Sequence, residues 1–384
     1  MSEQLRWLFR IFPILLSTCL LSPAHADADP GVSDTRILLG QSAGMSGPTA
    51  QYARQVLIGA KVYFDKINQQ GGVHGRRIEL RTRDDQYSAS LAAYNTRQLI
   101  ERDGVFALFG FVGWPTSQAG LQIASRAGVP FFAPFTGGAL HASFDRHLFS
   151  IRASYADEYA YFLRNMNWLG IRKLALLYQQ DQYGVMIKQD VDSRARREAI
   201  ELTSIGINHG GVNLDPLIDK TLSVQADVVM LVHADSQINA RIVRSLRNRG
   251  FLGQFFAVSF VGNKQLASEL GELAHGILVT QVVPLPWRIS MPLVAEYRKR
   301  MAESGYEEFT VTSLEGYIAA RVLVEGLKRA GRNLTRERLI RALESINARN
   351  YDGGGYVVNF SATNHQGSMY VDIATMTKDA RFMN

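Results

Sequence analysis

The sequence predicts an α/β protein with two doubly wound, mostly parallel sheets, each covered by helices on both faces. Three observations predict this fold. The 384 residues suffice for about two domains. Short apolar runs alternate with segments of helical periodicity, and this alternation begins twice along the chain. The runs are continuously apolar, as in parallel strands that are buried on both faces.

The first series of elements lies in the N-terminal part of the chain. Its expected strands are the apolar runs 37–40, 78–80, 105–109 and 129–132. After the first run, Val56, Ala60 and Phe64 fall on one helical stripe. Ser88 is expected to cap a second helix, and Pro115 to open a third.

A second series repeats the pattern. It begins with an expected helix at 155–169, and its expected strands are 174–178, 202–207, 228–232, 257–260 and 277–280. The alternation then breaks, with helices at 310–330 and 335–346 and strand-like runs at 356–359 and 370–376. Long helices after the second series suit a chain that returns to the first lobe.

The first 26 residues are predicted to be a cleavable signal peptide. Arg6 and Arg10 give a positive n-region, 11–21 is apolar, and Ala24-His25-Ala26 has the small-x-small form of a cleavage site. A lipoprotein would use the only cysteine, Cys19, which lies inside the apolar run. Cleavage removes that cysteine, which excludes disulfides and thiolate sites. We expect a periplasmic protein with no integral membrane segment after cleavage.

The net charge of +7 raises the question of a nucleic-acid partner. Such a partner needs a basic stripe with interleaved aromatic residues. Lysine and arginine are scattered instead, with local clusters only at 194–197 and 241–249, which we interpret as solvated helix faces. We therefore expect no nucleic-acid partner.

One short motif in the sequence is typical of an enzyme. Residues 40–44 match the G-x-S-x-G pattern of hydrolases around Ser42, but they follow the first strand, where no earlier strand is available to supply an oxyanion loop. The zinc-protease, P-loop and dinucleotide-binding patterns are absent from the sequence, and the histidines lack ligand spacing. We expect no enzyme activity, no cofactor and no metal.

Loops at the carboxyl ends of the expected strands are the remaining candidates, because open α/β sheets place their ligands there. These loops are 43–48, 110–117 and 134–138. Two of them lead into expected helix starts, whose free N–H groups and dipole favour an anion. A ligand carboxylate fits such a site without any arginine.

Five short blocks carry a family resemblance: Gly44-Met45-Ser46-Gly47-Pro48 with Tyr52, the glycine-containing stretch 67–75, Ile78-Glu79-Leu80 leading to Asp84-Asp85, Asp181-x-Tyr183-Gly184, and 276–280. In these blocks the chain resembles the periplasmic type I solute-binding proteins of the branched-chain amino acid (Leu/Ile/Val) and amide ABC transporter class. The resemblance implies two lobes joined by three crossovers. They close on a small ligand and present it to a permease in the inner membrane.

The resemblance also implies lobe boundaries. The N-terminal lobe is expected at 27–153 plus 283–347, and the C-terminal lobe at 154–282 plus 348–384. We expect a monomer. A second hypothesis is a periplasmic sensing subunit that signals to a membrane sensor protein, and neighbouring genes would separate the two.

Ligand contacts are implied by the same motifs. Gly113, Trp114 and Thr136 correspond to positions that hold the ligand carboxylate, and Phe135 to a backbone contact. The acid that binds the ligand ammonium should fall near 259–260, where the sequence has no carboxylate, and Asp157 is a possible substitute. A buried ammonium without an anionic partner is costly, so this gap weakens an α-amino acid assignment.

Aromatic side chains accumulate at the same loops: Tyr52, Phe111, Trp114, Phe135, Tyr155, Tyr183 and Phe260. Each of them also fits an ordinary core position. Aromatic contacts add about 0.5–1.5 kcal/mol beyond area burial. We therefore expect a receptor for a small carboxylate-bearing, amino-acid-like ligand with an apolar or aromatic body.

Overall fold

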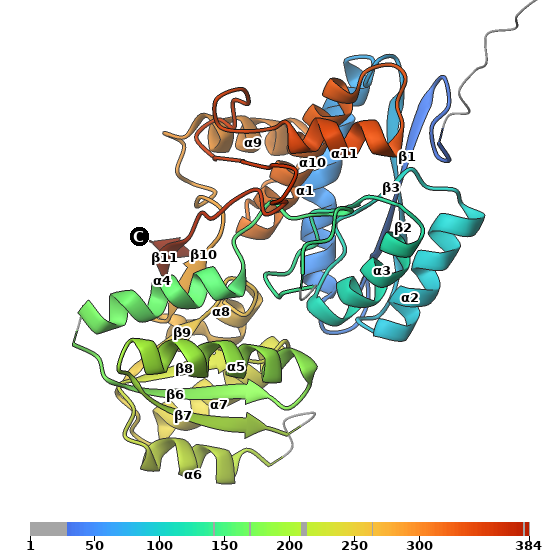
Figure 1. Cartoon of the computed structure of the whole chain (residues 1–384). Helices are drawn as coiled ribbons and strands as arrows, with labels where there is room; N and C mark the ends of the chain where they lie inside the picture. The colour runs from blue at the N-terminus through green and yellow to red at the C-terminus, as the bar shows by residue number, and fades with distance from the viewer. Residues whose placement is uncertain are drawn as a thin grey trace, which may run out of the picture.

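The two expected series of strands and helices form two α/β lobes in the computed structural model (Figure 1). The structure describes residues 29–140, 143–168, 170–208, 213–262, 264–378 and 381–383, so the expected signal peptide, 1–26, lies outside the described residues. Within these ranges, no helix has both the length and the apolar character needed to cross a bilayer.

The first sheet consists of five parallel strands in the order β2-β1-β3-β4-β5. They are β1 (Arg36–Ala43), β2 (Arg77–Asp84), β3 (Ala107–Phe109), β4 (Phe131–Phe132) and β5 (Leu148–Phe149). Successive β1 side chains enter two different cores: Ile37 and Leu39 pack on one face, and Leu38 packs on the other. This alternation explains the continuous apolar run, because both faces of the strand are covered.

Six helices cover this sheet: α1 (Ala50–Gln69), α2 (Ala89–Arg97, continued by a π-helical turn, Gln98–Arg102), α3 (Trp114–Arg126), α9 (Pro292–Glu303), α10 (Val311–Ala330) and α11 (Arg336–Glu344). Helix α10 lies along α1, although the whole second lobe separates them in the sequence (Figure 1). A Cβ on Gly59 would lie 1.8 Å from the carbonyl oxygen of Ser313, so only glycine allows the two backbones to come this close.

The second sheet has seven strands in the order β12-β11-β10-β9-β8-β6-β7. They are β6 (Lys173–Gln179), β7 (Glu201–Ile207), β8 (Val228–Val232), β9 (Gln254–Ala257), β10 (Leu278–Gln281), β11 (Asp372–Met376) and β12 (Phe382–Met383). Strands β6 to β10 are parallel, and the two C-terminal strands are added antiparallel at one edge. The helices of this lobe are α4 (Tyr155–Trp168), α5 (Gln182–Arg197), α6 (Asp215–Ser223), α7 (Ser236–Asn248) and α8 (Lys264–Leu270).

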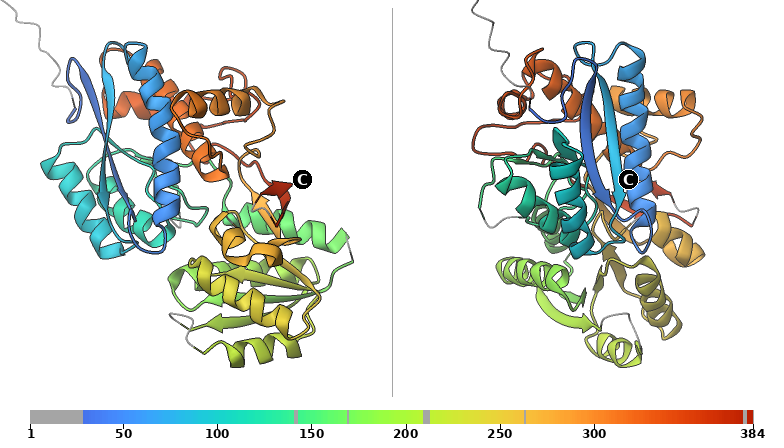
Figure 2. Two further views of the ribbon diagram at one scale, coloured as in Figure 1. Left: turned by 180° about the vertical axis from the view of Figure 1, so that it is seen from behind. Right: turned by 90° about the vertical axis from the view of Figure 1, so that its right-hand side faces the viewer.

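The chain crosses between the lobes three times: from β5 to α4, from β10 to α9, and after α11 to β11 (Figure 2). The side chain of Tyr356, in the third crossover, forms hydrogen bonds with the other two crossovers. The Tyr356 hydroxyl group donates to the carbonyl oxygens of Ile151, at 2.7 Å, and of Val282, at 3.1 Å. The three connecting segments are therefore tied to one another at a single buried point.

The segment after α11 differs from expectation. Residues 356–359 form no strand, so that prediction is wrong. The side chains do alternate between buried and exposed, but no neighbouring strand pairs with this segment. Tyr356, Val358 and Phe360 pack in the core around α10, which favours a third crossing after 360 rather than at 347. We propose that 348–360 belongs with the first lobe, and the other expected boundaries stay predictions.

Candidate functional site

Aromatic side chains from both lobes meet where the carboxyl ends of the two sheets face each other. Tyr52, in the first turn of α1, stacks on Phe260 of the second lobe, with ring centroids 4.8 Å apart and planes 10° apart. Its hydroxyl group donates to the Phe260 carbonyl oxygen at 2.5 Å. Tyr52 thus joins the two lobes through both a ring contact and a hydrogen bond.

Three further rings extend this contact. Phe135 follows β4 and lies 5.9 Å from Tyr52, while Tyr183, at the start of α5, lies 6.4 Å from Phe260. Tyr155, at the start of α4, meets Tyr183 edge to face at 6.0 Å. We call these five residues the interlobe aromatic cluster. All of them are at least 96% buried, and the core that contains them is continuous from one lobe to the other.

Two hydroxyl groups at this site lack a partner. The Oη atoms of Tyr159 and Tyr183 are buried and have no hydrogen-bond partner among the described residues. Burial raises the pKa of both phenols well above the ordinary value, so both groups are neutral donors at physiological pH. An unsatisfied buried hydroxyl costs free energy that a bound ligand can recover.

A cavity of about 770 Å³ opens beside the aromatic cluster. Its lining includes residues from both lobes and from two crossovers, among them Thr136, Gly138, Arg152, Tyr155, Tyr159, Met186 and Gln366. Ligand pockets usually measure about 300–1,000 Å³. The cavity is therefore large enough for a small organic ligand, and Thr136 is the predicted carboxylate contact that lines it.

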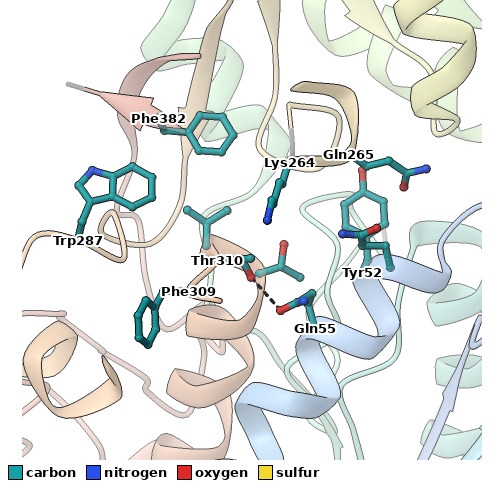
Figure 3. Close-up of a pocket in the computed structure, with 11 residues that line it drawn as sticks. Tyr52, Gln55, Lys264, Gln265, Trp287, Phe309, Thr310 and Phe382 are labelled. Atoms are coloured by element: carbon teal, nitrogen blue, oxygen red, sulfur yellow. Dashed lines mark hydrogen bonds between the residues drawn. The ribbon is translucent and has the colours of Figure 1, made fainter. Parts of the chain in front are cut away.

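A second, smaller cavity of about 40 Å³ is lined by Tyr52 (Figure 3). Figure 3 shows Lys264 reaching from the second lobe into the space between Tyr52 and Trp287. Lys264, which lines this cavity, pairs with Glu308 of the first lobe at 2.6 Å. The volume suits a water molecule or two rather than an organic ligand.

Beneath the aromatic cluster lies a second group of side chains, which we call the charged cluster: Arg152, Glu158 and Glu315. Arg152 contacts Glu158 at 3.3 Å and Glu315 at 3.2 Å. The Arg152 guanidinium carbon lies 5.3 Å from the centre of the Phe135 ring, which places the two clusters in contact. Arg152 and Glu158 are at least 99% buried, and Glu315 is 94% buried.

The pKa values of the two acids are displaced by this environment. Burial raises the pKa of Glu315 to about 7, with Arg152 acting in the lowering direction and Glu158 in the raising direction. Burial likewise raises the pKa of Glu158, against the lowering effect of Arg152 and of hydrogen bonds from Thr280 and Ser259. The cluster therefore holds one arginine against two acids that resist ionisation.

Trp114 and Gly113 shape the loop walls around the site. The Trp114 indole N–H donates to the Ala139 carbonyl oxygen at 2.9 Å and so fastens the loop after β4. Gly113 has a φ of +92°, and a Cβ there would lie 2.3 Å from the ring of Tyr87, which follows β2. Tyr87 thus packs directly on a loop that we predicted to hold the ligand carboxylate.

Of the predicted contacts, Thr136 and Tyr155 line the large cavity and Tyr52 lines the small one, whereas the others line neither. Phe111 is fully buried in the core of the first lobe, 4.6 Å from the Phe131 ring, and it lines neither cavity. Asp157 accepts hydrogen bonds from the backbone and hydroxyl of Ser154 and from the Gln366 amide. Its carboxylate caps the first turn of α4 and does not line the large cavity. Phe111 and Asp157 stay predicted ligand contacts, although neither lines the large cavity.

The hydrolase-like motif has a structural role. Ser42 is fully buried, donates to the Asp85 carboxylate at 2.8 Å and accepts from Asn95 at 3.3 Å. A nucleophilic serine needs an exposed oxygen and a neighbouring base such as histidine. Ser42 instead helps to hold the turn that carries Tyr87, because Asp85 also accepts from the Tyr87 backbone N–H.

Comparison with known proteins identifies the family. The model of a family described as periplasmic binding protein matches residues 37–381, which is most of the chain. The chain belongs to the periplasmic binding protein family. It is similar to Leu/Ile/Val-binding protein homolog 7 of Brucella abortus (strain 2308), with 25% identity over 334 residues that cover 80% of this chain and 81% of that protein.

Solved structures of the family share the fold. A substrate-binding periplasmic protein from Ralstonia solanacearum is 28% identical, covers 90% of this chain and 99% of its own, and has a TM-score of 0.82. A branched-chain amino acid ABC transporter protein from Thermus thermophilus with bound valine has 18% identity, a TM-score of 0.82, and coverage of 92% and 96%. The predicted α/β fold with two lobes is confirmed, and the chain is a solute-binding protein rather than an enzyme.

The sequence pattern did not predict a role at this junction for Tyr87, Tyr159 or any member of the charged cluster. One signal was available: Arg152 interrupts the otherwise uncharged stretch from Leu148 to Tyr155, where a buried charge needs a partner. Glu158 follows six residues later in the chain, whereas Glu315 reaches Arg152 only once the chain has returned to the first lobe.

Proposed function

We propose that this chain is the extracytoplasmic receptor of an ABC importer, closing its two lobes around a small carboxylate-bearing ligand with an apolar or aromatic body. The observation that carries the proposal is the interlobe aromatic cluster beside a cavity of about 770 Å³. Rings from both lobes lie at the carboxyl ends of parallel strands, the usual ligand position in open α/β sheets.

The chemistry of the walls supports this ligand class. Thr136, Gly137 and Gly138 line the cavity and offer hydroxyl and backbone groups to a carboxylate, while Trp114 fixes their loop. The aromatic cluster offers apolar area to the ligand body. Relatives named for leucine, isoleucine and valine, and a neighbour with bound valine, point to the same class.

Hinge closure provides the mechanism. A ligand that contacts both lobes stabilises the closed form by its differential affinity for it. The three crossovers, fastened at Tyr356, confine the change to a movement of one lobe against the other. We propose that the closed monomer then docks on an inner-membrane permease, and that residues 1–26 direct the chain to the periplasm and are removed there.

Thermal unfolding of residues 27–384 tests the ligand class. The panel contains leucine, phenylalanine, their amides, and the matched carboxylates 4-methylpentanoate and 3-phenylpropanoate. Ligand at 100 times its dissociation constant adds about 2.7 kcal/mol to the free energy of unfolding, enough to move the midpoint by several degrees. We expect a shift with at least one carboxylate-bearing member and none with the amides.

Substitution tests the site. For whichever compound shifts the midpoint, Trp114→Ala and Phe135→Ala are each expected to weaken affinity. Unchanged affinity in both variants would contradict the proposal. Loss of uptake of that compound on deletion of the gene would support an importer, whereas intact uptake with a lost transcriptional response would favour a sensing subunit.

A further inference from the structure

We propose that Arg152 and Tyr159 form a donor subsite in the large cavity, which selects a ligand with a neutral carbonyl oxygen in its body. The inference rests on the proposed function and adds to it a second recognition group, apart from the loop that would hold the ligand carboxylate. The two donors are the Nε–H group of Arg152 and the hydroxyl group of Tyr159. Both side chains are at least 99% buried, and neither donor has a hydrogen-bond partner among the described residues.

The contacts of Arg152 engage two of the three nitrogen atoms in its guanidinium group. Its Nη1 atom contacts Glu315 at 3.2 Å, and its Nη2 atom contacts Glu158 at 3.3 Å and the hydroxyl group of Ser259. Neither glutamate lines the large cavity, whereas Arg152 does. The charged cluster therefore presents a positively charged N–H donor to the cavity, and not its carboxylates.

Tyr159 reaches the same cavity from helix α4. It follows Tyr155 by about one helical turn, so the two side chains lie on the same side of the helix, and both line the cavity. Tyr155 interacts with Thr136, the predicted carboxylate contact, and also with Tyr159. The donor subsite and the predicted carboxylate contact thus share one neighbour. Because Thr136 lines the cavity too, one ligand can contact both.

The guanidinium group of Arg152 is held in place before any ligand binds. Its two terminal nitrogen atoms contact the two glutamates of the charged cluster. The centres of the Phe135 and Tyr155 rings lie 5.3 and 5.9 Å from its central carbon. A donor that is already ordered loses little conformational freedom when it meets a ligand atom. The Nε–H group is therefore a preorganised donor, unlike that of an exposed arginine.

The charges around the subsite favour a neutral acceptor over a second carboxylate. The Arg152 guanidinium already faces two glutamates, so a carboxylate beside it would add a third acidic group to one cation. Asp145 and Asp190 also line the cavity, and their charges disfavour a further anion. A carbonyl oxygen has two lone pairs and no charge, so it can accept from both donors without this cost.

The same two donors disfavour a ligand that carries only hydrocarbon at this position. A methylene group placed against them would displace solvent without replacing its hydrogen bonds. The complex would then contain two buried donors without partners, and this lowers affinity. The subsite therefore discriminates between ligands that differ by a single carbonyl oxygen.

Two matched pairs of carboxylates test this discrimination. The first pair is 4-methyl-2-oxopentanoate and 4-methylpentanoate, and the second is 4-oxo-4-phenylbutanoate and 4-phenylbutanoate. Within each pair a carbonyl group replaces one methylene group, and the two pairs place it at different distances from the carboxylate. Titration calorimetry at pH 7 gives the dissociation constants. In at least one pair we expect the oxo acid to bind about tenfold more tightly, and equal binding within both pairs would overturn the proposal.

A pair of tyrosine variants identifies the hydroxyl donor. Tyr159→Phe removes the hydroxyl group and keeps the ring, so the oxo acid should lose about fivefold in affinity while its matched partner changes less than about twofold. Tyr161→Phe, on the same helix but outside the cavity lining, is the control and should keep the full preference for the oxo acid. An undiminished preference in Tyr159→Phe would overturn the subsite.

A spectroscopic measurement on the wild-type protein reads the arginine donor directly. The ¹⁵N–¹H resonance of the Arg152 Nε–H group is identified by its proximity to the Phe135 and Tyr155 rings. It is followed during separate titrations with acetamide, which has a neutral carbonyl oxygen, and with acetate, which has a carboxylate. We expect a saturable shift of the resonance with acetamide and a smaller shift with acetate.

The titrations with acetamide and acetate also separate this inference from the proposed function. If acetamide shifts the Arg152 resonance while none of the four carboxylates binds, the donor subsite stands and the proposed ligand class fails. If acetamide causes no shift, or acetate causes the larger one, the subsite for a neutral oxygen is overturned. Because this readout uses the wild-type protein, it decides the question even if Tyr159→Phe does not fold.

Discussion

The aromatic cluster and the charged cluster lie against each other at the same junction between the lobes, yet they are built in different ways. The aromatic cluster uses rings 4.8 to 6.4 Å apart, together with hydroxyl hydrogen bonds such as that from Tyr52 to the Phe260 carbonyl oxygen. The charged cluster joins the first crossover, α4 and α10 through a single guanidinium. The aromatic cluster is a non-directional contact, whereas the charged cluster has a charge that must be balanced.

This difference indicates which of the two clusters can exchange its contacts. Apolar area can be exchanged between protein and ligand with little penalty, because ring contacts tolerate small rearrangements. A buried charge cannot lose its partner without a large cost. We therefore expect substitutions in the charged cluster to affect folding, and those in the aromatic cluster to affect ligand binding.

Removal of the guanidinium should have the largest effect. Arg152→Met leaves Glu158 and Glu315 buried without a cation, and we expect a loss of about 3–5 kcal/mol in the free energy of unfolding at pH 7.5. Urea unfolding measures it. The loss should shrink at pH 5, where the raised pKa values allow both acids to be neutral. An equal loss at both pH values would mean that packing, not charge, explains it.

Truncation of a ring should separate the aromatic cluster from the ordinary core. Phe135→Leu is expected to weaken ligand affinity about tenfold, because it removes an aromatic contact at the proposed ligand site. Phe111→Leu, in the core of the first lobe, should lower the melting temperature while the folded protein keeps its dissociation constant. Titration calorimetry on both variants makes the comparison. A weakened affinity in Phe111→Leu would support Phe111 as a ligand contact.

Loss of the hydroxyl bond between the lobes should have a smaller effect. Tyr52→Phe removes the bond to the Phe260 carbonyl oxygen but keeps the stacked ring. A hydrogen bond of this kind contributes about 1 kcal/mol, so we expect ligand affinity to fall about fivefold. Tyr94→Phe, at an exposed position on α2, is the matched control and should change nothing.

An exposed ion pair should give the smallest effect. The Arg146 guanidinium holds the pKa of Glu337 at about 2, below its unfolded value. Stability from this pair is present above about pH 4.3 and is lost as the pH falls toward 2. Because both side chains are 43% exposed, Glu337→Gln should cost less than about 1 kcal/mol at pH 7. If Glu337→Gln lowered the free energy of unfolding as much as Arg152→Met, then buried and exposed ion pairs would not differ in their contribution to stability.

The sequence predicted the lobes well, because buried parallel strands leave continuous apolar runs that need no knowledge of distant contacts. It failed at 356–359, where the alternating pattern is real but no strand is available to pair with it. Strand formation depends on a partner that the local sequence does not encode.

Only part of the candidate site could be predicted, because the local sequence does not encode contacts with distant segments. Tyr52, Phe135 and Phe260 could be placed at the junction of the lobes because each comes soon after a strand whose end could be located, and their role as ligand contacts stays a prediction. Phe111 also follows a strand, but its side chain faces the core, and the direction of a loop side chain is not readable from spacing. The charged cluster joins Arg152 and Glu158, which are six residues apart, to Glu315, which is 163 residues from Arg152, and its charge balance appears only after folding.

The close crossing of α1 and α10 at Gly59 also bears on the order of folding. Strands β6 to β10 of the second lobe come from one continuous stretch of chain, whereas the first lobe needs a helix that is synthesised after that stretch is complete. Closing so long a loop is slow and costs entropy. In refolding from urea, protection of backbone amides should therefore appear in the second lobe first, and the first lobe should gain its protection only when α10 docks.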